Sequence, residues 1–139
     1  MAESKYAKYI ITETDPEPRA REKAAKLSDK LTYLLHTGGD IVEGAQWVNC
    51  VWFWKGFDEP LVERHTHDYD EVLSFFGTDP EDPHDLCGEI EFWMDDEKHI
   101  LEKSSMIFVP KGLRHCPLII RRVDRPIFHF STGQTTSYS

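Results

Sequence analysis

Two short stretches of the sequence carry side chains that could bind a metal ion. The first reads H-x-H-x-x-x-E from His65 to Glu71, and the second reads P-x-G-x-x-H and ends at His115. Residues two apart on a strand point to the same face, so His65 and His67 would present two imidazoles side by side. A turn can then return the Glu71 carboxylate toward them, and the Pro-x-Gly turn can deliver the third imidazole from a neighbouring strand.

Three imidazole nitrogens and one carboxylate oxygen form a borderline-to-hard ligand set. Such a set suits one divalent transition metal ion (Fe, Mn, Ni, Co or Zn) and lacks the thiolates of a structural zinc site. Four protein ligands on an octahedral metal leave two adjacent positions, which a chelating substrate could fill. We therefore expect a small-molecule substrate that is rich in oxygen, such as a keto acid, an enol or a diketone.

The two stretches resemble the two characteristic motifs of the cupins, over roughly residues 44–130. The resemblance implies an all-β fold, a single-domain antiparallel jelly-roll barrel with one metal ion inside. Two glycines that usually flank these motifs are replaced by Glu59 and Ser104, at positions that shape turns rather than bind metal. Carried over residue by residue, the cupin metal ligands are His65, His67, Glu71 and His115.

Composition restricts the partners and the compartment. The chain has 139 residues, with 16 basic and 25 acidic side chains and a net charge of −9, which argues against nucleic acid and anionic membranes. No apolar run approaches the ~20 residues that span a bilayer, and residues 1–5 lack an apolar signal core. Three cysteines without a disulfide or CxxC pattern agree with a cytoplasmic location.

The resemblance, together with the pattern of apolar residues, implies three parts of the chain. Residues 1–43 form an N-terminal arm and helix packed on the barrel, residues 44–131 form the barrel, and residues 132–139 form a flexible tail. Within the first part we expect a short strand at residues 6–11 and a helix from about residue 18 to 29. Because the apolar arm could cover an exposed sheet edge of a second copy, we expect a homodimer.

Four barrel segments follow from the β pattern. Residues 47–54 are rich in aromatic and β-branched side chains, residues 61–67 form the first ligand strand, and residues 71–76 form the next strand. Residues 89–94 alternate cleanly, which places Ile90, Phe92 and Met94 on one face.

Three further residues are candidates for roles beside the metal. Glu63 shares a predicted strand face with the first two histidines, so it is either a catalytic base or a residue on the rim of the barrel. His129 lies between two phenylalanines in the sequence, on the opposite strand face from both. Either the phenylalanines fill the core and His129 lies outside, or His129 points inward as a catalytic group. Arg114 could fix a substrate carboxylate by a bidentate contact, or lie on the surface.

The resemblance implies a mononuclear metal enzyme, and the glutamate in the ligand set favours isomerase- or lyase-type enolate chemistry on the chelated metabolite. Two alternatives stay open at this point. One is a metal-dependent dioxygenase, and the other is a binding protein that holds a metal or a metabolite without turnover.

Overall fold

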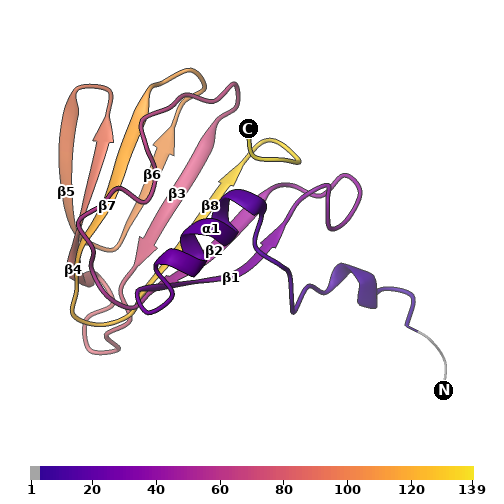
Figure 1. Ribbon diagram of the computed structural model, residues 1–139, viewed down its shortest axis with the longest axis horizontal. Coiled ribbons are helices and arrows are strands. Elements are labelled where there is room, and N and C mark those ends of the chain that lie inside the picture. Colours follow the sequence, from indigo (N-terminus) through magenta and orange to yellow (C-terminus); the bar gives the residue numbers. More distant parts are fainter. Residues whose placement is uncertain (1–3) are drawn as a thin grey trace.

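The computed structural model describes residues 4–139 and contains two antiparallel sheets that face each other across one apolar core (Figure 1). The larger sheet has the strand order β1-β2-β8-β3-β6, and the smaller has the order β5-β4-β7. This arrangement confirms the predicted all-β jelly roll with a short N-terminal helix. The strands are β1 (Leu31–Thr37), β2 (Val48–Phe53), β3 (Glu71–Phe76), β4 (Asp85–Met94), β5 (Glu97–Lys103), β6 (Ser105–Val109), β7 (His115–Val123) and β8 (Ile127–Gly133).

Strand alternation fills the core between the sheets. In β4, Ile90 and Phe92 are fully buried and Met94 packs against the same core, as the alternating sequence predicts. Phe53 of β2 and Phe75 of β3 meet them from the larger sheet and are also fully buried. The inner faces of the two sheets therefore form the walls that hold the candidate ligands.

Helix α1 (Pro18–Lys26) lies where the sequence places a helix, although it ends three residues earlier than residue 29. Pro18 at its first turn suits a helix start, because proline has no amide hydrogen to leave unbonded there. At the end of the helix, the backbone N–H of Leu27 donates a hydrogen bond to the carbonyl of Lys23, and the Leu27 side chain joins the apolar core. The helix thus packs against β1, and its C-terminal end contributes to the core.

Two predicted strands are absent from the described residues. The segment at residues 6–11 contains instead a single 3-10 turn, η1 (Ala7–Tyr9), which runs away from both sheets (Figure 1). Its apolar side chains cover no sheet edge among residues 4–139, and Tyr6 and Ile10 are 69% and 71% exposed. Residues 61–67 lie beside β7 of the smaller sheet and pair with it at two isolated bridges, Val62 with Leu118 and His65 with His115. This segment is therefore extended but is not a regular strand.

The ends of the barrel also differ from the predicted boundaries. Strand β1 pairs along its length with β2, so residues 31–37 belong to the larger sheet rather than to the N-terminal arm. Strand β8 continues to Gly133 and pairs with both β2 and β3. Within residues 4–139, no helix is long and apolar enough to cross a membrane.

Candidate metal centre

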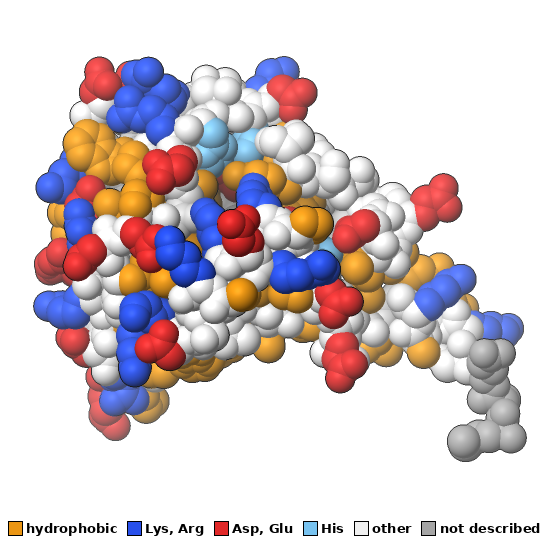
Figure 2. All heavy atoms as spheres, in the orientation of Figure 1, with side chains coloured by type: hydrophobic (Ala, Val, Ile, Leu, Met, Phe, Trp, Pro, Cys, Tyr) orange, Lys and Arg blue, Asp and Glu red, His pale blue; other side chains and the backbone are white. Residues whose placement is uncertain are grey.

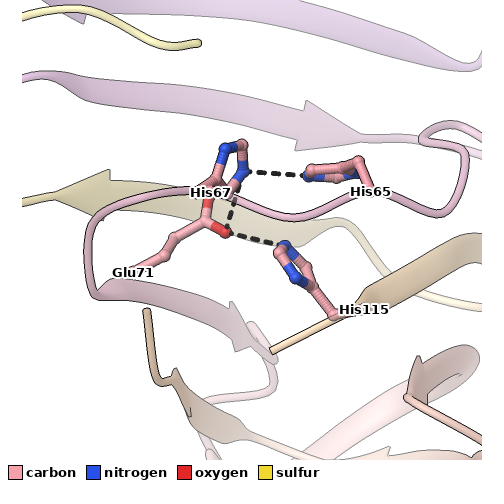
Figure 3. A group of neighbouring side chains, drawn as sticks. All are labelled: His65, His67, Glu71 and His115. Carbon is pink, nitrogen blue, oxygen red and sulfur yellow. Dashed lines mark hydrogen bonds and ion pairs between the residues drawn. The ribbon is translucent and has the colours of Figure 1, made fainter. Parts of the chain in front are cut away.

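Four side chains from three segments meet at the mouth of the barrel (Figure 3). The nitrogen and oxygen atoms that His65, His67, Glu71 and His115 could offer to a metal all lie within 4.8 Å of one another. The Nε2 atoms of His65 and His67 are 2.9 Å apart, and Glu71 Oε1 lies 3.1 Å from His115 Nε2 and 3.6 Å from His67 Nε2. The structure thus brings together the whole ligand set expected from the sequence.

Backbone pairing holds the two ligand segments in register. His65 and His115 exchange two backbone hydrogen bonds, each 3.0 Å long, and the N–H of Gly112 donates to the carbonyl of His67 at 2.9 Å. Gly112 has a φ of +83°, which glycine adopts without strain, so the Pro-x-Gly turn can fold back on the first segment. Glu71 is the first residue of β3, so its backbone is held by the sheet between Val109 and Gly133.

Asp70 ties the two ligand turns together through its side chain. Its Oδ1 accepts a hydrogen bond of 2.8 Å from the backbone N–H of Lys111. Replacing Asp70 with alanine is expected to lower the free energy of unfolding by about 1 kcal/mol, because one partly exposed hydrogen bond is lost. Urea unfolding measures this, with the exposed neighbour Asp68→Ala as a control that should change little. If both variants lost the same free energy of unfolding, the hydrogen bond of Asp70 would not stabilise the fold.

The three histidines are held in the tautomer that leaves Nε2 free to bind a metal. Each Nδ1–H donates to a backbone carbonyl: His65 to Glu63 at 2.6 Å, His67 to Ser139 at 2.5 Å and His115 to Leu113 at 2.9 Å. Such bonds fix both the proton and the orientation of a metal-binding imidazole. Because burial lowers the pKa values of His65 and His67, both rings favour the neutral form.

The resulting atoms fit a divalent transition metal ion. Three Nε2 lone pairs and one carboxylate oxygen converge with no N–H among them, an arrangement that a cation at their centre satisfies. Metal bonds of about 2.1 Å at right angles would place neighbouring ligand atoms roughly 3 Å apart, close to the separations found here. Glu71 and His115 are only 4% and 1% exposed, so solvent competes weakly for them.

A small cavity lies beside the ligand cluster. Its volume is about 70 Å³, well below the ~300–1,000 Å³ of typical ligand pockets. The larger sheet supplies one wall through Asn49, Val51 and Leu73, and Leu61 and Leu118 close the opposite side. Of the four ligands, His65 is half-buried rather than buried, so the cluster can be reached from solvent at this residue.

Two basic side chains from α1 line this cavity, and the sequence reasoning missed both. Arg19 and Lys23 are four residues apart, so they share one face of the helix. Lys23 donates from Nζ to the carbonyl of Leu61, and its pKa is lowered by burial and then by the charge of Arg19. The i, i+4 spacing was the available signal, but only the packing of α1 shows that this face looks into the barrel.

Tyr138 closes the cavity from the C-terminal segment, a position with no signal in the sequence. Its hydroxyl lies 3.2 Å from Nε2 of His65, and the Arg19 guanidinium lies 3.4 Å from its ring centroid. Trp47 packs on the same ring, with centroids 5.0 Å apart. Burial raises the pKa of the Tyr138 phenol, so this group stays protonated and can donate a hydrogen bond. The segment expected to be a loose tail therefore contributes to the site.

Glu63 and Arg114 do not line the cavity. The Glu63 side chain is exposed, because residues 61–67 do not form the regular strand that would turn it inward. Arg114 is also exposed and binds Asp95 in the β4–β5 turn, with bonds of 3.1 Å from Nε and 2.7 Å from Nη2 to the same oxygen. Only the backbone carbonyl of Glu63 takes part in the centre, as the acceptor for His65.

His129 points into the barrel and lines the cavity, so the inward alternative holds for its position. Its ring lies between Phe53 and Phe75, with centroids 5.5 and 4.6 Å away, and Nδ1–H donates to the carbonyl of Ser74 at 2.8 Å. Complete burial lowers the pKa of His129 to about 4, so the imidazole is neutral near pH 7. Nε2 is left as an acceptor on the cavity wall.

No protein-family model matches the sequence, and no curated protein is significantly similar to it. Among solved structures, an oxalate oxidase in complex with the substrate analogue glycolate aligns with a TM-score of 0.52 and 12% identity, over 78% of this chain and 52% of its own. The DMSP lyase DddQ from Ruegeria pomeroyi aligns with a TM-score of 0.49 and 20% identity, over 83% and 52% of the two chains. A cupin superfamily protein from Desulfitobacterium hafniense aligns with a TM-score of 0.47 and 16% identity, over 74% of each chain.

This chain spans about half the length of the oxalate oxidase and of the DMSP lyase. At such identities the likeness concerns the fold and does not extend to substrate or reaction. The strand order of the two sheets and the likeness to the oxalate oxidase agree with each other. The chain therefore shares its antiparallel double-sheet fold with the oxalate oxidase, to which it is similar in structure.

Proposed function

We propose that the chain is a metal-dependent enzyme that acts on a small oxygen-rich acid by isomerase- or lyase-type enolate chemistry. One observation carries this proposal: four acceptor atoms without an N–H converge beside a cavity whose remaining polar wall includes two cationic side chains. The acceptors call for a metal cation, and the cationic groups call for an anionic substrate. A keto acid carries both the chelating oxygens and the negative charge.

His65, His67, Glu71 and His115 would hold the metal through three Nε2 atoms and a carboxylate oxygen. A divalent transition metal ion at this position supplies a Lewis acid, which lowers the pKa of a bound hydroxyl or of a carbon next to a carbonyl. The iron, manganese, nickel, cobalt and zinc ions all accept this ligand set.

The other cavity residues would bind the substrate and handle its protons. Arg19 and Lys23 attract and orient a carboxylate. Tyr138 donates a hydrogen bond from its hydroxyl, which lies beside the ligand His65. His129 accepts a hydrogen bond at Nε2, and its low pKa makes it a positioning group rather than a strong base.

The size of the cavity favours a second candidate, a binding protein without turnover. A space of about 70 Å³ admits only a very small ligand while Tyr138 lies over it. A substrate with more than a few heavy atoms requires that ring to move. Isomerisation and oxygen-uptake assays on a panel of keto acids and diketones separate the two candidates, because only the enzyme consumes its ligand.

Oxalate or pyruvate should bind to the metal-loaded protein and raise its melting temperature. A ligand at 100 times its Kd adds about 2.7 kcal/mol to the free energy of unfolding. Lys23→Met should weaken this binding by about 10-fold or more, because a charge-assisted hydrogen bond is worth ~1.5–3 kcal/mol. Arg114→Met removes an equal charge outside the cavity and should leave the affinity unchanged. If chelating acids do not change the melting temperature of the metal-loaded protein, the enzyme proposal is refuted.

A further inference from the structure

The outer face of the larger sheet carries no charged side chain. Strand register places its outward residues in three rows across the sheet, and every member is apolar, Ser or Thr. The first row is Thr37, Val48, Thr132, Val72 and Phe108; the second is Leu35, Cys50, Phe130, Ser74 and Met106; the third is Thr32, Trp52, Phe128 and Phe76. We call this set the uncharged face.

The smaller sheet shows what a solvated face of this protein looks like. Glu91 of β4 points outward there and binds Arg121 of β7 at 3.1 Å, with Lys98 of β5 3.9 Å away. Figure 2 likewise shows acidic and basic side chains spread over the face it draws. In a chain with 41 charged residues, counted as 16 basic plus 25 acidic, a whole sheet face without one is a departure from the rest of the surface.

Large apolar side chains on the uncharged face remain open to solvent. Met106 and Phe108 on the edge strand β6 are 64% and 56% exposed. Nearer the centre of the face, the aromatic rings mainly contact one another. Examples are the pairs Trp52–Phe128 and Phe76–Phe130, with ring centroids 5.0 and 5.9 Å apart. Helix α1 does not cover this face, because its buried Leu27 joins the core on the opposite side of the sheet. The face is therefore an unpartnered apolar surface.

The extent of the uncharged face approaches that of a small specific interface. Five strands about 4.8 Å apart and about six residues long at ~3.4 Å each give a flat extent of roughly 20 Å by 20 Å. As flat rectangles, two such faces bring together about 800 Å², and the relief of the aromatic rings raises the accessible area toward the ~1,000 Å² at which specific interfaces begin. Apolar patches of ~300–600 Å² on one chain often serve binding.

We propose that the uncharged face binds the same face of a second copy of this chain, giving a two-fold symmetric dimer. A chain of net charge −9 repels its own copy unless the surfaces that meet are uncharged, and this face meets that condition. The lack of charge also gives a nucleic acid, an anionic lipid surface or a charged protein nothing complementary to bind. A self-complementary apolar patch is what an isologous interface requires.

The dimer would form behind the metal centre and independently of its chemistry. Strands β3 and β8 carry Glu71 and His129 on their inner faces, while their outer faces would meet the partner. The mouth of the barrel, with the ligand cluster and Tyr138, remains on the other side of the sheet. The inference therefore does not rest on the proposed enzymatic function.

Sedimentation equilibrium of the full chain at 5–50 μM tests the proposal. The wild type should have twice the mass of one chain, and Phe108→Lys should raise the dimer dissociation constant by 100-fold or more. Ile100→Lys is the matched control, because Ile100 is 44% exposed on the outer face of the smaller sheet, and it should stay dimeric. Met106→Lys repeats the test if Phe108→Lys does not fold by circular dichroism.

Three results would overturn the proposal. One is a monomeric wild type at 50 μM, including a monomer that sediments with neutral lipid vesicles. Another is a Phe108→Lys or Met106→Lys variant that folds and stays fully dimeric. The third is a dimer that Tyr9→Lys dissociates and the sheet variants do not, since Tyr9 is 58% exposed on the N-terminal arm and lies outside the uncharged face.

Discussion

His115→Ala is expected to abolish the stabilisation that a divalent transition metal gives to the folded chain. His115 is 1% exposed and provides one of four converging acceptor atoms, so the remaining three cannot complete the set. A metal ion at 1,000 times its Kd adds about 4.1 kcal/mol to the free energy of unfolding of the wild type. The variant should gain much less at the same concentration, as measured by melts with metal and with a chelator.

Comparing each protein with and without metal separates ligand loss from the packing defect that alanine leaves. His99→Ala removes an exposed histidine from β5 and should keep the full metal-dependent gain. Glu71→Gln keeps the shape of the side chain while removing its negative charge, so it should lower the gain with little loss of packing. A His115→Ala protein that still carries one equivalent of tightly bound metal would disprove the ligand assignment.

His129→Phe is expected to make the protein less sensitive to acid. The pKa of His129 falls from an ordinary 6.5 to about 4 in the folded chain, so the unfolded chain binds more protons between those pH values. The neutral ring costs nothing above pH 6.5, and stability is lost as the pH falls toward 4. At pH 4.5 the loss from this one group is about 2.5 kcal/mol, at ~1.36 kcal/mol per pKa unit.

The phenylalanine ring suits the space between Phe53 and Phe75, although it leaves the carbonyl of Ser74 without its donor. That defect is the same at all pH values, so the readout is the change in unfolding free energy between pH 7 and 4.5 rather than its absolute value. His99→Gln should retain the wild-type pH dependence. Parallel pH profiles for the wild type and His129→Phe would mean that His129 is not held neutral.

The ligand set could be predicted from the sequence because residue type and spacing carry it. A His-x-His pair and a Pro-x-Gly turn specify local geometry, and two backbone bonds between His65 and His115 complete it. Arg19 and Tyr138 reach the same cavity from opposite ends of the chain, and no local pattern relates residues 119 positions apart, the difference between 138 and 19. Such partners depend on the packing of α1 and of the C-terminal segment.

The ambiguity at His129 has a physical origin that the structure makes clear. Alternation identifies the inward side of a strand only when the two faces differ in polarity. In β8 the outward residues Phe128 and Phe130 are apolar too, because they belong to the uncharged face. The prediction of a strand at residues 61–67 was wrong for another reason. Two isolated bridges position the histidines of this segment, so no continuous ladder of backbone hydrogen bonds is needed.

The strand order has a consequence for how the chain can fold during synthesis. Strand β8 is made after the other seven strands of the two sheets, yet it lies in the middle of the larger sheet, between β2 and β3. Until residues 127–133 leave the ribosome, both of those strands have an open edge. More than 70 residues separate β2 from β8, its second partner in the sheet. Pairings between such distant segments form slowly, and open edges favour aggregation. The nascent chain is therefore expected to be most prone to aggregation before β8 is inserted.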